Sequence, residues 1–199
     1  MQTQTIEEQL QARDLVLLGP CSGLSQRTEL LQASPLLRDF TPAEADLLGD
    51  GMLWVRAQPG QLLIAEGESS DWLMLLLQGT VDVGKRKIGA EIDKQVPGDI
   101  TRLAVLKEGA VIGEMSMLDG EPRYASCWAL SEVEAAVLTR AAVARLINAH
   151  PAVCAKLLVK LTQLLAQRLR NTSNQLVKNL QKIGKDAALN APGPGPGTA

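Results

Sequence analysis

The sequence predicts an α+β protein, in which an antiparallel β jelly-roll barrel is flanked by N-terminal helices and by a long C-terminal helix. Two patterns carry this prediction. Between residues 52 and 139, short apolar segments of strand length alternate with glycine-containing turns, a spacing that is typical of compact barrels and jelly rolls. From residue 152 onward, leucines recur at helical spacing, which indicates one long amphipathic helix.

The residues before the barrel are expected to be helical. Residues 5–18 carry a mild helical pattern, glycine and proline interrupt it at 19–23, and residues 24–40 resume it. Thr41, Pro42 and Glu44 then match a helix start, with an N-cap, a proline in the first turn and a glutamate three residues after the cap. We therefore expect an N-terminal helical extension over residues 1–23, followed by a domain over residues 24–185.

The barrel strands are expected between turns that contain glycine, proline or aspartate. Residues 84–101 are hydrophilic and should form the tip of a long hairpin. The expected strands cover residues 52–57, 61–66, 72–78, 80–86, 102–108, 124–130 and 133–139.

The C-terminal helices are expected over residues 139–150 and, after His150 and Pro151, from residue 152 to about residue 185. The second helix would be about 51 Å long, which exceeds the roughly 40 Å diameter of a globule of this size. From Leu165 to Ile183 its apolar residues follow near-heptad steps, so we expect a homodimer through this helix. The alternative is a helix that folds back at residues 171–174. The Pro/Gly-rich residues 186–199 should form a disordered tail.

The composition argues against several classes of protein. A net charge of −2 gives no overall positive field for nucleic acid, and aromatic residues are only 3% of the chain, too few for a base-stacking platform. The single histidine argues against a histidine-rich metal site or a Ser-His-Asp hydrolase. The odd number of cysteines, without a CxxC motif, favours unpaired thiols and a cytoplasmic location. No apolar run reaches the roughly 20 residues that a membrane span needs.

One segment, VIGEMSMLDGEPRYAS at residues 111–126, carries the chemistry of an anion site. Gly113 allows the backbone to approach a ligand, and the turn after it can aim amide N–H groups at an anion. The planar guanidinium of Arg123 can hold two phosphate oxygens. Glu114 can accept hydrogen bonds from a sugar hydroxyl. These residues indicate a phosphorylated sugar ligand; the alternative is that Glu114 and Arg123 simply pair with each other.

The segment GEMSMLDGEPRYAS resembles the phosphate-binding cassette of cyclic nucleotide-binding domains. The resemblance extends over residues 24–185 and implies an eight-stranded jelly-roll barrel followed by two helices. It implies that Glu114 binds the ribose 2′-hydroxyl and that Arg123 binds the cyclic phosphate. The Arg-Leu-Arg-Asn-Thr-Ser sequence at 168–173 is similar to the C-helix of the catabolite-activator branch of the family, where a Thr-Ser pair reaches the base. The implied ligand-binding residues are Gly113, Glu114, Met115, Ser116, Arg123, Tyr124, Ala125, Thr172 and Ser173.

The chain departs from the family pattern at Tyr124, where relatives often have a small residue or a hydroxyl. A missing threonine there weakens an interpretation as a cGMP binder, and we expect the tyrosine ring to point outward. Nothing after Lys185 can form a helix-turn-helix, so no direct DNA binding is expected.

The expected function is that of a stand-alone cytoplasmic sensor of a cyclic nucleotide, preferably cAMP. It would have no catalytic activity, no cofactor and no metal, and it would signal to an unknown downstream protein partner by rearranging its helices. Two alternatives remain open: a ligand-free dimerisation scaffold of the same fold, and a binder of cGMP or another nucleotide. A third, an enzyme that uses the barrel as cupins do, is disfavoured because His150 is the only histidine.

Overall fold

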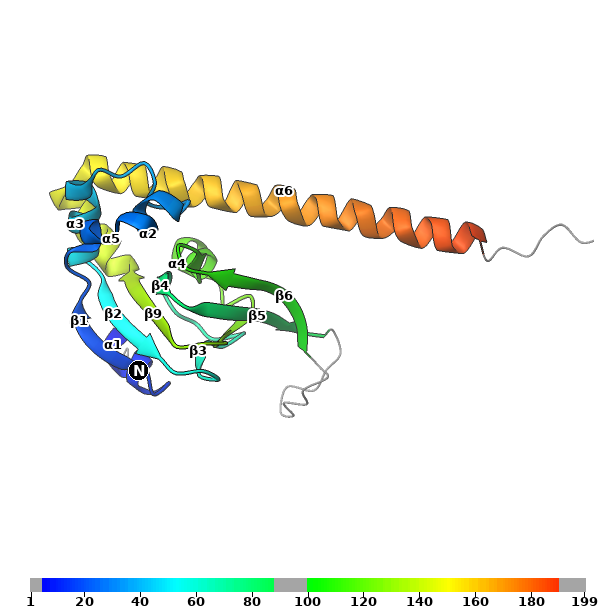
Figure 1. Cartoon of the computed structure of the whole chain (residues 1–199), viewed down its shortest axis with the longest axis horizontal. Coiled ribbons are helices and arrows are strands. Elements are labelled where there is room, and N and C mark those ends of the chain that lie inside the picture. The colour runs from blue at the N-terminus through cyan, green and yellow to red at the C-terminus, as the bar shows by residue number, and fades with distance from the viewer. Residues whose placement is uncertain (1–4, 88–99, 190–199) are drawn as a thin grey trace, which may run out of the picture. The chain divides into compact units, whose positions relative to one another are not determined.

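The computed structural model describes residues 5–87 and 100–189, with side chains as far as residue 183 (Figure 1). The chain forms two compact units, Met1–Lys160 and Leu161–Ala199. The first unit contains all of the described strands, so it holds the predicted β domain. No helix among the described residues is both long enough and apolar enough to span a membrane.

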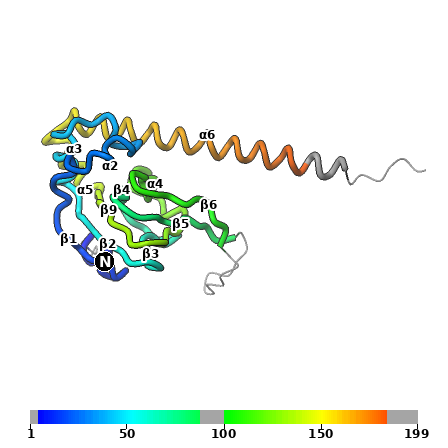
Figure 2. The backbone as a smooth tube through the Cα atoms, viewed as in Figure 1, coloured from blue at the N-terminus to red at the C-terminus, as the bar shows by residue number. Residues whose placement is uncertain are grey.

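The described strands form two antiparallel sheets. One sheet has the order β1-β2-β9-β4-β7 and the other has the order β3-β8-β5-β6, and the tube in Figure 2 shows β1, β2 and β9 side by side. Together they make the predicted jelly-roll-like arrangement as a sandwich of two open sheets and not as a closed barrel. The strands are β1 (Val16–Pro20), β2 (Leu53–Ala57), β3 (Leu62–Ile64), β4 (Trp72–Gln78), β5 (Thr80–Arg86), β6 (Ile100–Lys107), β7 (Val111–Ile112), β8 (Ser126–Ala129) and β9 (Val133–Thr139).

The hydrophobic core lies between the two sheets. It collects buried side chains from β2, β4 and β9 of the first sheet and from β3, β5 and β8 of the second. Trp72, at the start of β4, is fully buried in this core. Strand β4 lies inside its sheet, paired with both β9 and β7. Its six consecutive side chains from Trp72 to Leu77 are buried, so both faces of the strand are covered, which explains the continuous apolar sequence.

The N-terminal extension differs from the predicted helix. Helix α1 covers only Ile6–Gln11, and Val16–Pro20 forms β1, which pairs with β2. The prediction of helix through residue 18 was therefore wrong. Asp14 adopts a left-handed φ of 58° that ends the helical geometry, and the apolar residues that follow gain more from backbone pairing with β2 than from another helical turn.

The helices before the barrel are short. Residues 24–40 do not form one helix: they contain the 3₁₀ turn η1 (Leu24–Gln26) and helix α2 (Thr28–Ala33), which ends before Pro35. Helix α3 (Pro42–Asp50) begins as predicted, because Thr41 and Glu44 form a reciprocal capping box and Pro42 stands in the first turn.

Three helices follow the cassette glycine. Helix α4 (Glu114–Asp119) lies inside the cassette, and α5 (Arg140–Ala149) begins at the N-cap Thr139 and ends at His150. Helix α6 spans Pro151–Leu189, so it continues four residues beyond the predicted end near residue 185. The rest of the predicted tail, 190–199, and most of the predicted hairpin tip, 88–99, lie outside the described residues.

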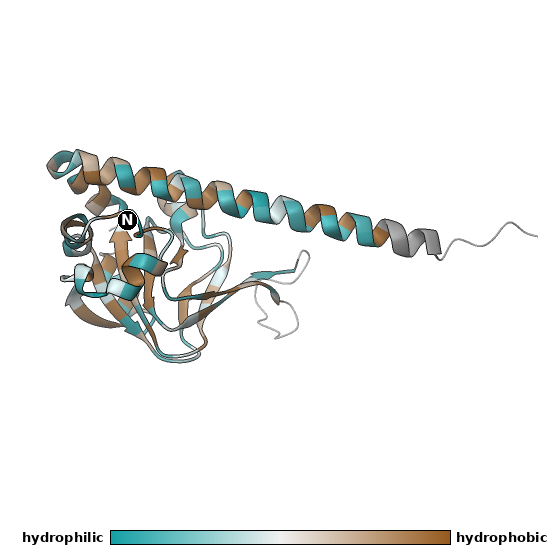
Figure 3. Ribbon diagram, turned by 45° about the horizontal axis from the view of Figure 1, so that its top comes forward, coloured by the Kyte–Doolittle hydropathy of each residue, from teal (hydrophilic) through white to brown (hydrophobic). Residues whose placement is uncertain are grey.

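Helix α6 belongs to both units, and each part has its own surroundings. In the first unit, Lys156 donates to both carboxylate oxygens of Glu44 at 2.7 Å, and Lys160 pairs with Asp39. In the second unit, hydrophobic and hydrophilic residues alternate along the ribbon of the helix (Figure 3), and from residue 169 onward its large apolar residues are exposed. These are Leu169, Leu176, Val177, Leu180 and Ile183.

Candidate functional site

The cassette turn is built around Gly113, which adopts a left-handed φ of 75° as the N-cap of α4. A Cβ atom at this position would lie 2.5 Å from Nη1 of Arg123 and 3.0 Å from Cδ1 of Ile64. Both the backbone conformation and the close approach of the guanidinium therefore require glycine. At Gly113, where the sequence predicts that a ligand approaches the backbone, the guanidinium of Arg123 packs against the backbone.

Arg123 is buried and is fixed at both ends of its guanidinium. Its Nη1 donates to the carbonyl of Gly113 and its Nη2 donates to the carbonyl of Trp72, both at 2.6 Å. Its Cζ lies 4.3 Å from the centre of the Trp72 ring, within the range of a cation–π interaction. The structure thus brings Arg123, which is predicted to bind the phosphate, together with the predicted turn at Gly113.

One donor of the buried Arg123 guanidinium lacks a hydrogen-bond acceptor in the described part of the chain. Only 3% of the residue is exposed, and its Nε–H finds no acceptor within the described residues. The pKa of Arg123 is lowered to about 10, chiefly by burial and also by the nearby Arg13, although Cys127, Glu114 and Glu68 raise it. At neutral pH the group remains a buried cation, so an anion placed beside its Nε–H would relieve an unfavourable arrangement.

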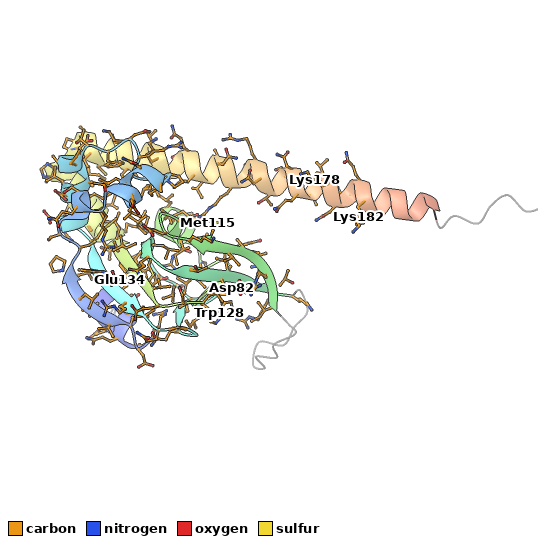
Figure 4. All side chains as sticks on the ribbon, viewed as in Figure 1. Asp82, Met115, Trp128, Glu134, Lys178 and Lys182 are labelled. Carbon is orange, nitrogen blue, oxygen red and sulfur yellow. The ribbon has the colours of Figure 1, made fainter. Side chains whose placement is uncertain are left out.

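The other cassette residues divide into buried and exposed positions. Glu114 and Ser116 are buried, and the Glu114 carboxylate acts electrostatically on Arg123. Met115, labelled on α4 in Figure 4, is 42% exposed. The first turn of α4 therefore turns its polar side chains inward and its methionine toward solvent.

Tyr124 follows Arg123 and points outward, as expected. The residue is 56% exposed. The ammonium of Lys85 lies 3.9 Å from the centre of its ring and also donates to its carbonyl at 2.7 Å. Ala125 is half-buried beside it. The tyrosine ring is therefore held against β5 by a lysine.

Arg140 ties the cassette helix to α5. Its Nε donates to the carbonyl of Met117 at 2.9 Å and its Nη2 donates to the carbonyl of Ser116 at 3.0 Å. Its own backbone N–H donates to the carbonyl of Asp71 at 2.8 Å. Cations at a helix C-terminus satisfy its last carbonyls, so Arg140 links the end of α4 to the first residue of α5.

Two of the predicted ligand residues, Thr172 and Ser173, lie on α6 in the second unit, where both are exposed. Their contact with a nucleobase stays a prediction. A separate cleft of about 550 Å³ lies in the first unit, between α1, residues 69–71 and the start of α5. It is lined by none of the predicted ligand residues.

Comparison with known proteins shows which family has this fold and this cassette. The family model described as "Cyclic nucleotide-binding domain" matches residues 54–150, a range that includes Gly113, Glu114 and Arg123. A crystal structure of a cyclic nucleotide-binding domain from Methylobacillus flagellatus is 34% identical, with a TM-score of 0.72, over 83% of this chain and 89% of that one. The chain belongs to the cyclic nucleotide-binding domain family.

Within this family, the chain is similar to regulators of two kinds. It is 28% identical over 148 residues to a CRP-like cAMP-activated global transcriptional regulator of Mycobacterium tuberculosis, covering 74% of this chain and 61% of the relative. It is 28% identical over 136 residues to a cAMP-dependent protein kinase regulatory subunit of Yarrowia lipolytica, covering 68% of this chain and 33% of the relative. The chain thus spans less than two thirds of the length of these relatives.

One element of the site was missed at the level of sequence. Trp72 supplies both a carbonyl and a ring to Arg123, although the two residues are 51 positions apart. Its aromatic type at the start of an apolar strand is equally typical of an ordinary core residue. No local pattern distinguishes the two roles; only the fold places the ring beside the cassette.

Proposed function

We propose that this protein is a cyclic nucleotide sensor that prefers cAMP, has no catalytic activity and signals by moving its helices against a partner protein. The observation that carries the proposal is the buried guanidinium of Arg123, whose Nε–H lacks an acceptor within the described residues. A cyclic phosphate carries one negative charge and exocyclic oxygens that suit the guanidinium fork.

The remaining cassette residues suit the other parts of such a ligand. Glu114, buried in the first turn of α4, would accept from the ribose 2′-hydroxyl. Backbone N–H groups near Ser116 and at Tyr124–Ala125 would complete the phosphate cradle, with Gly113 and Met115 lining the turn. Thr172 and Ser173 would contact the base. A preference for cAMP agrees with the tyrosine at 124, where a hydroxyl that aids guanine recognition is replaced.

The signal would leave the site through α4. A phosphate that binds the backbone N–H groups of the Gly113 turn would shift α4. Arg140 couples α4 to α5 through two hydrogen bonds. The base of α6 is in turn fixed to α3 by the Lys156–Glu44 ion pair. Ligand would then favour one arrangement of these helices only by the difference between its affinities for the two arrangements.

The exposed apolar residues of α6 beyond residue 160 favour self-association, so we propose a homodimer through this helix. Their spacing follows the near-heptad pattern that a helix–helix interface requires. We place the protein in the cytoplasm, since its three cysteines are buried and form no disulfide bond and therefore suit a reducing compartment.

A thermal-shift panel tests the proposed function. Wild type would be heated with cAMP, cGMP, cyclic dinucleotides and linear AMP. At 100 times its Kd a ligand adds about 2.7 kcal/mol, or about 5–11 °C in Tm for a chain of this size. We expect this shift with cAMP and little with linear AMP. A shift in Arg102→Ala but not in Arg123→Ala would assign it to the buried arginine, because Arg102 is an exposed arginine paired with Asp82. No shift with any nucleotide would instead favour a ligand-free scaffold.

A further inference from the structure

The ring of Trp72 is contacted by two guanidinium groups, and only one of them belongs to the cassette. Cζ of Arg123 lies 4.3 Å from the ring centre and Cζ of Arg13 lies 6.0 Å from it. The indole Nε1–H donates to Oε1 of Gln9 at 3.1 Å. Gln9 lies on α1 and Arg13 lies just after it, so the N-terminal segment fixes the orientation of the ring on which Arg123 stacks.

Arg13 is itself held in place and is largely buried. Its Nη1 donates to the carbonyl of Gln9 at 2.6 Å, and its Nη2 pairs with the carboxylate of Glu68. Its side chain is 13% exposed. Nearby, Leu10 is fully buried in the core between the sheets, and β1 pairs with β2. The segment that carries Arg13 is therefore an integral part of the first unit.

Arg13 is also linked to the backbone of Arg123, through Glu68. The residue that Arg13 pairs with, Glu68, accepts the backbone N–H of Arg123 on its carbonyl at 2.8 Å. The neighbouring Gly67 donates its N–H to the carbonyl of Arg123 at 2.9 Å. The ion pair thus fixes the loop against which the backbone of Arg123 is hydrogen-bonded, while Trp72 supports its side chain.

The positive charge of Arg13 also favours the binding of an anion at Arg123. Burial lowers the pKa of Arg123 most, and the positive charge of Arg13 also lowers it, whereas Cys127, Glu114 and Glu68 raise it. A second guanidinium close to Arg123 makes the local potential more positive. An anion bound at Arg123 therefore gains from both cations, while Glu68 offsets part of the gain.

We propose that Gln9 and Arg13 are positioning residues for the phosphate site, acting on Arg123 through the Trp72 ring and the Glu68 loop. The inference rests on the proposed function. It makes the N-terminal segment, which lies outside the residues 54–150 matched by the family model, a working part of the ligand site. Loss of the Arg13 guanidinium should weaken binding of a cyclic nucleotide about five- to twentyfold, although Arg13 lies outside the cassette.

The test compares Arg13→Met with Arg27→Met in the full chain. Arg27 is a matched control, because its Cζ lies 5.2 Å from the ring of Trp54 and it pairs with Glu134, away from the cassette. Calorimetric titration with cAMP should show the loss in Arg13→Met only. In a variant that already carries Arg123→Lys, adding Arg13→Met should weaken cAMP binding by less than about twofold. The reason is that the effects of two residues that act as one unit do not add. An equal loss in both backgrounds, or no loss in wild type, overturns the proposal.

A ligand-independent readout separates this inference from the proposed function. The Nε–H resonance of Arg123, assigned by its disappearance in Arg123→Lys, should shift in Arg13→Met and stay in place in Arg27→Met. If wild type binds no cyclic nucleotide, the proposed function fails and this resonance alone decides the positioning role: an unchanged resonance overturns it. If Arg13→Met does not fold by circular dichroism, Arg13→Lys replaces it under the same criteria, because it keeps the charge and loses the planar group.

Discussion

Replacing Gly113 by alanine tests the geometry of the site at its tightest point. The added Cβ would lie 2.5 Å from Nη1 of Arg123 and 3.0 Å from Cδ1 of Ile64, in a backbone with a φ of 75°. The left-handed conformation alone costs a non-glycine residue about 1–2 kcal/mol. The contact with Arg123 adds a separate effect, because the guanidinium must leave its place between the Gly113 and Trp72 carbonyls.

Gly60→Ala separates the two effects. Gly60 has a φ of 86°, and a Cβ built on it meets nothing within 4 Å, so this variant carries the backbone strain without the displacement of Arg123. Gly60→Ala should lose about 2–8 °C in Tm, at about 2–4 °C per kcal/mol, and Gly113→Ala should lose at least as much because it also displaces Arg123. Only Gly113→Ala should also lose binding of cAMP, by about 2 kcal/mol or roughly 30-fold.

Differential scanning fluorimetry measures the stability of the two variants and isothermal titration calorimetry measures their affinity. If Gly113→Ala binds cAMP as tightly as Gly60→Ala, the close packing of Gly113 against Arg123 has no part in the ligand site. The reasoning about the cassette turn would then be refuted.

The remaining predictions concern acid stability, helix coupling and assembly. The ion pair with Lys156 and the capping bonds lower the pKa of Glu44 from 4.5 to about 2, so its stabilising contribution is present above pH 4.5 and is lost as the pH falls toward 2. Melting curves across this range should show a shallower pH dependence in Glu44→Gln, and an identical one would contradict the assignment. Arg140→Met leaves two α4 carbonyls without their cation and should cost about 1–3 kcal/mol in chemical denaturation; no loss would remove the proposed link to α5. The double variant Leu176→Glu and Leu180→Glu should turn a dimer into a monomer by light scattering, whereas an unchanged mass would exclude α6 as the interface.

Features that depend on neighbouring residues in the sequence could be predicted correctly. The capping box of α3 needs only Thr41, Pro42 and Glu44, and it forms as expected. The alternation of strands and turns depends likewise on short segments, and the two antiparallel sheets follow it closely. The turn at Gly113 was also predicted from its own residue type, because glycine readily adopts the left-handed conformation that it has there.

Features that depend on distant residues were harder to predict. The apolar run after Leu15 fits a helix as well as a strand, and its pairing with β2, about forty residues later, decides for the strand. In the same way, the support of Arg123 by Trp72 and Arg13 depends on side chains brought together only by the fold. Contact of Thr172 and Ser173 with a base also needs an arrangement that one chain's sequence does not specify.

The central claim is that the buried guanidinium of Arg123 binds the phosphate of a cyclic nucleotide. Calorimetric titration of wild type and Arg123→Lys with cAMP tests it most directly, because lysine keeps the charge but loses the planar fork and the Nε–H donor. The account predicts saturable binding at one site per chain in wild type and a loss of about 1.5–3 kcal/mol in the variant, the contribution of a hydrogen bond to a charged group. Equal affinities in the two proteins would contradict it.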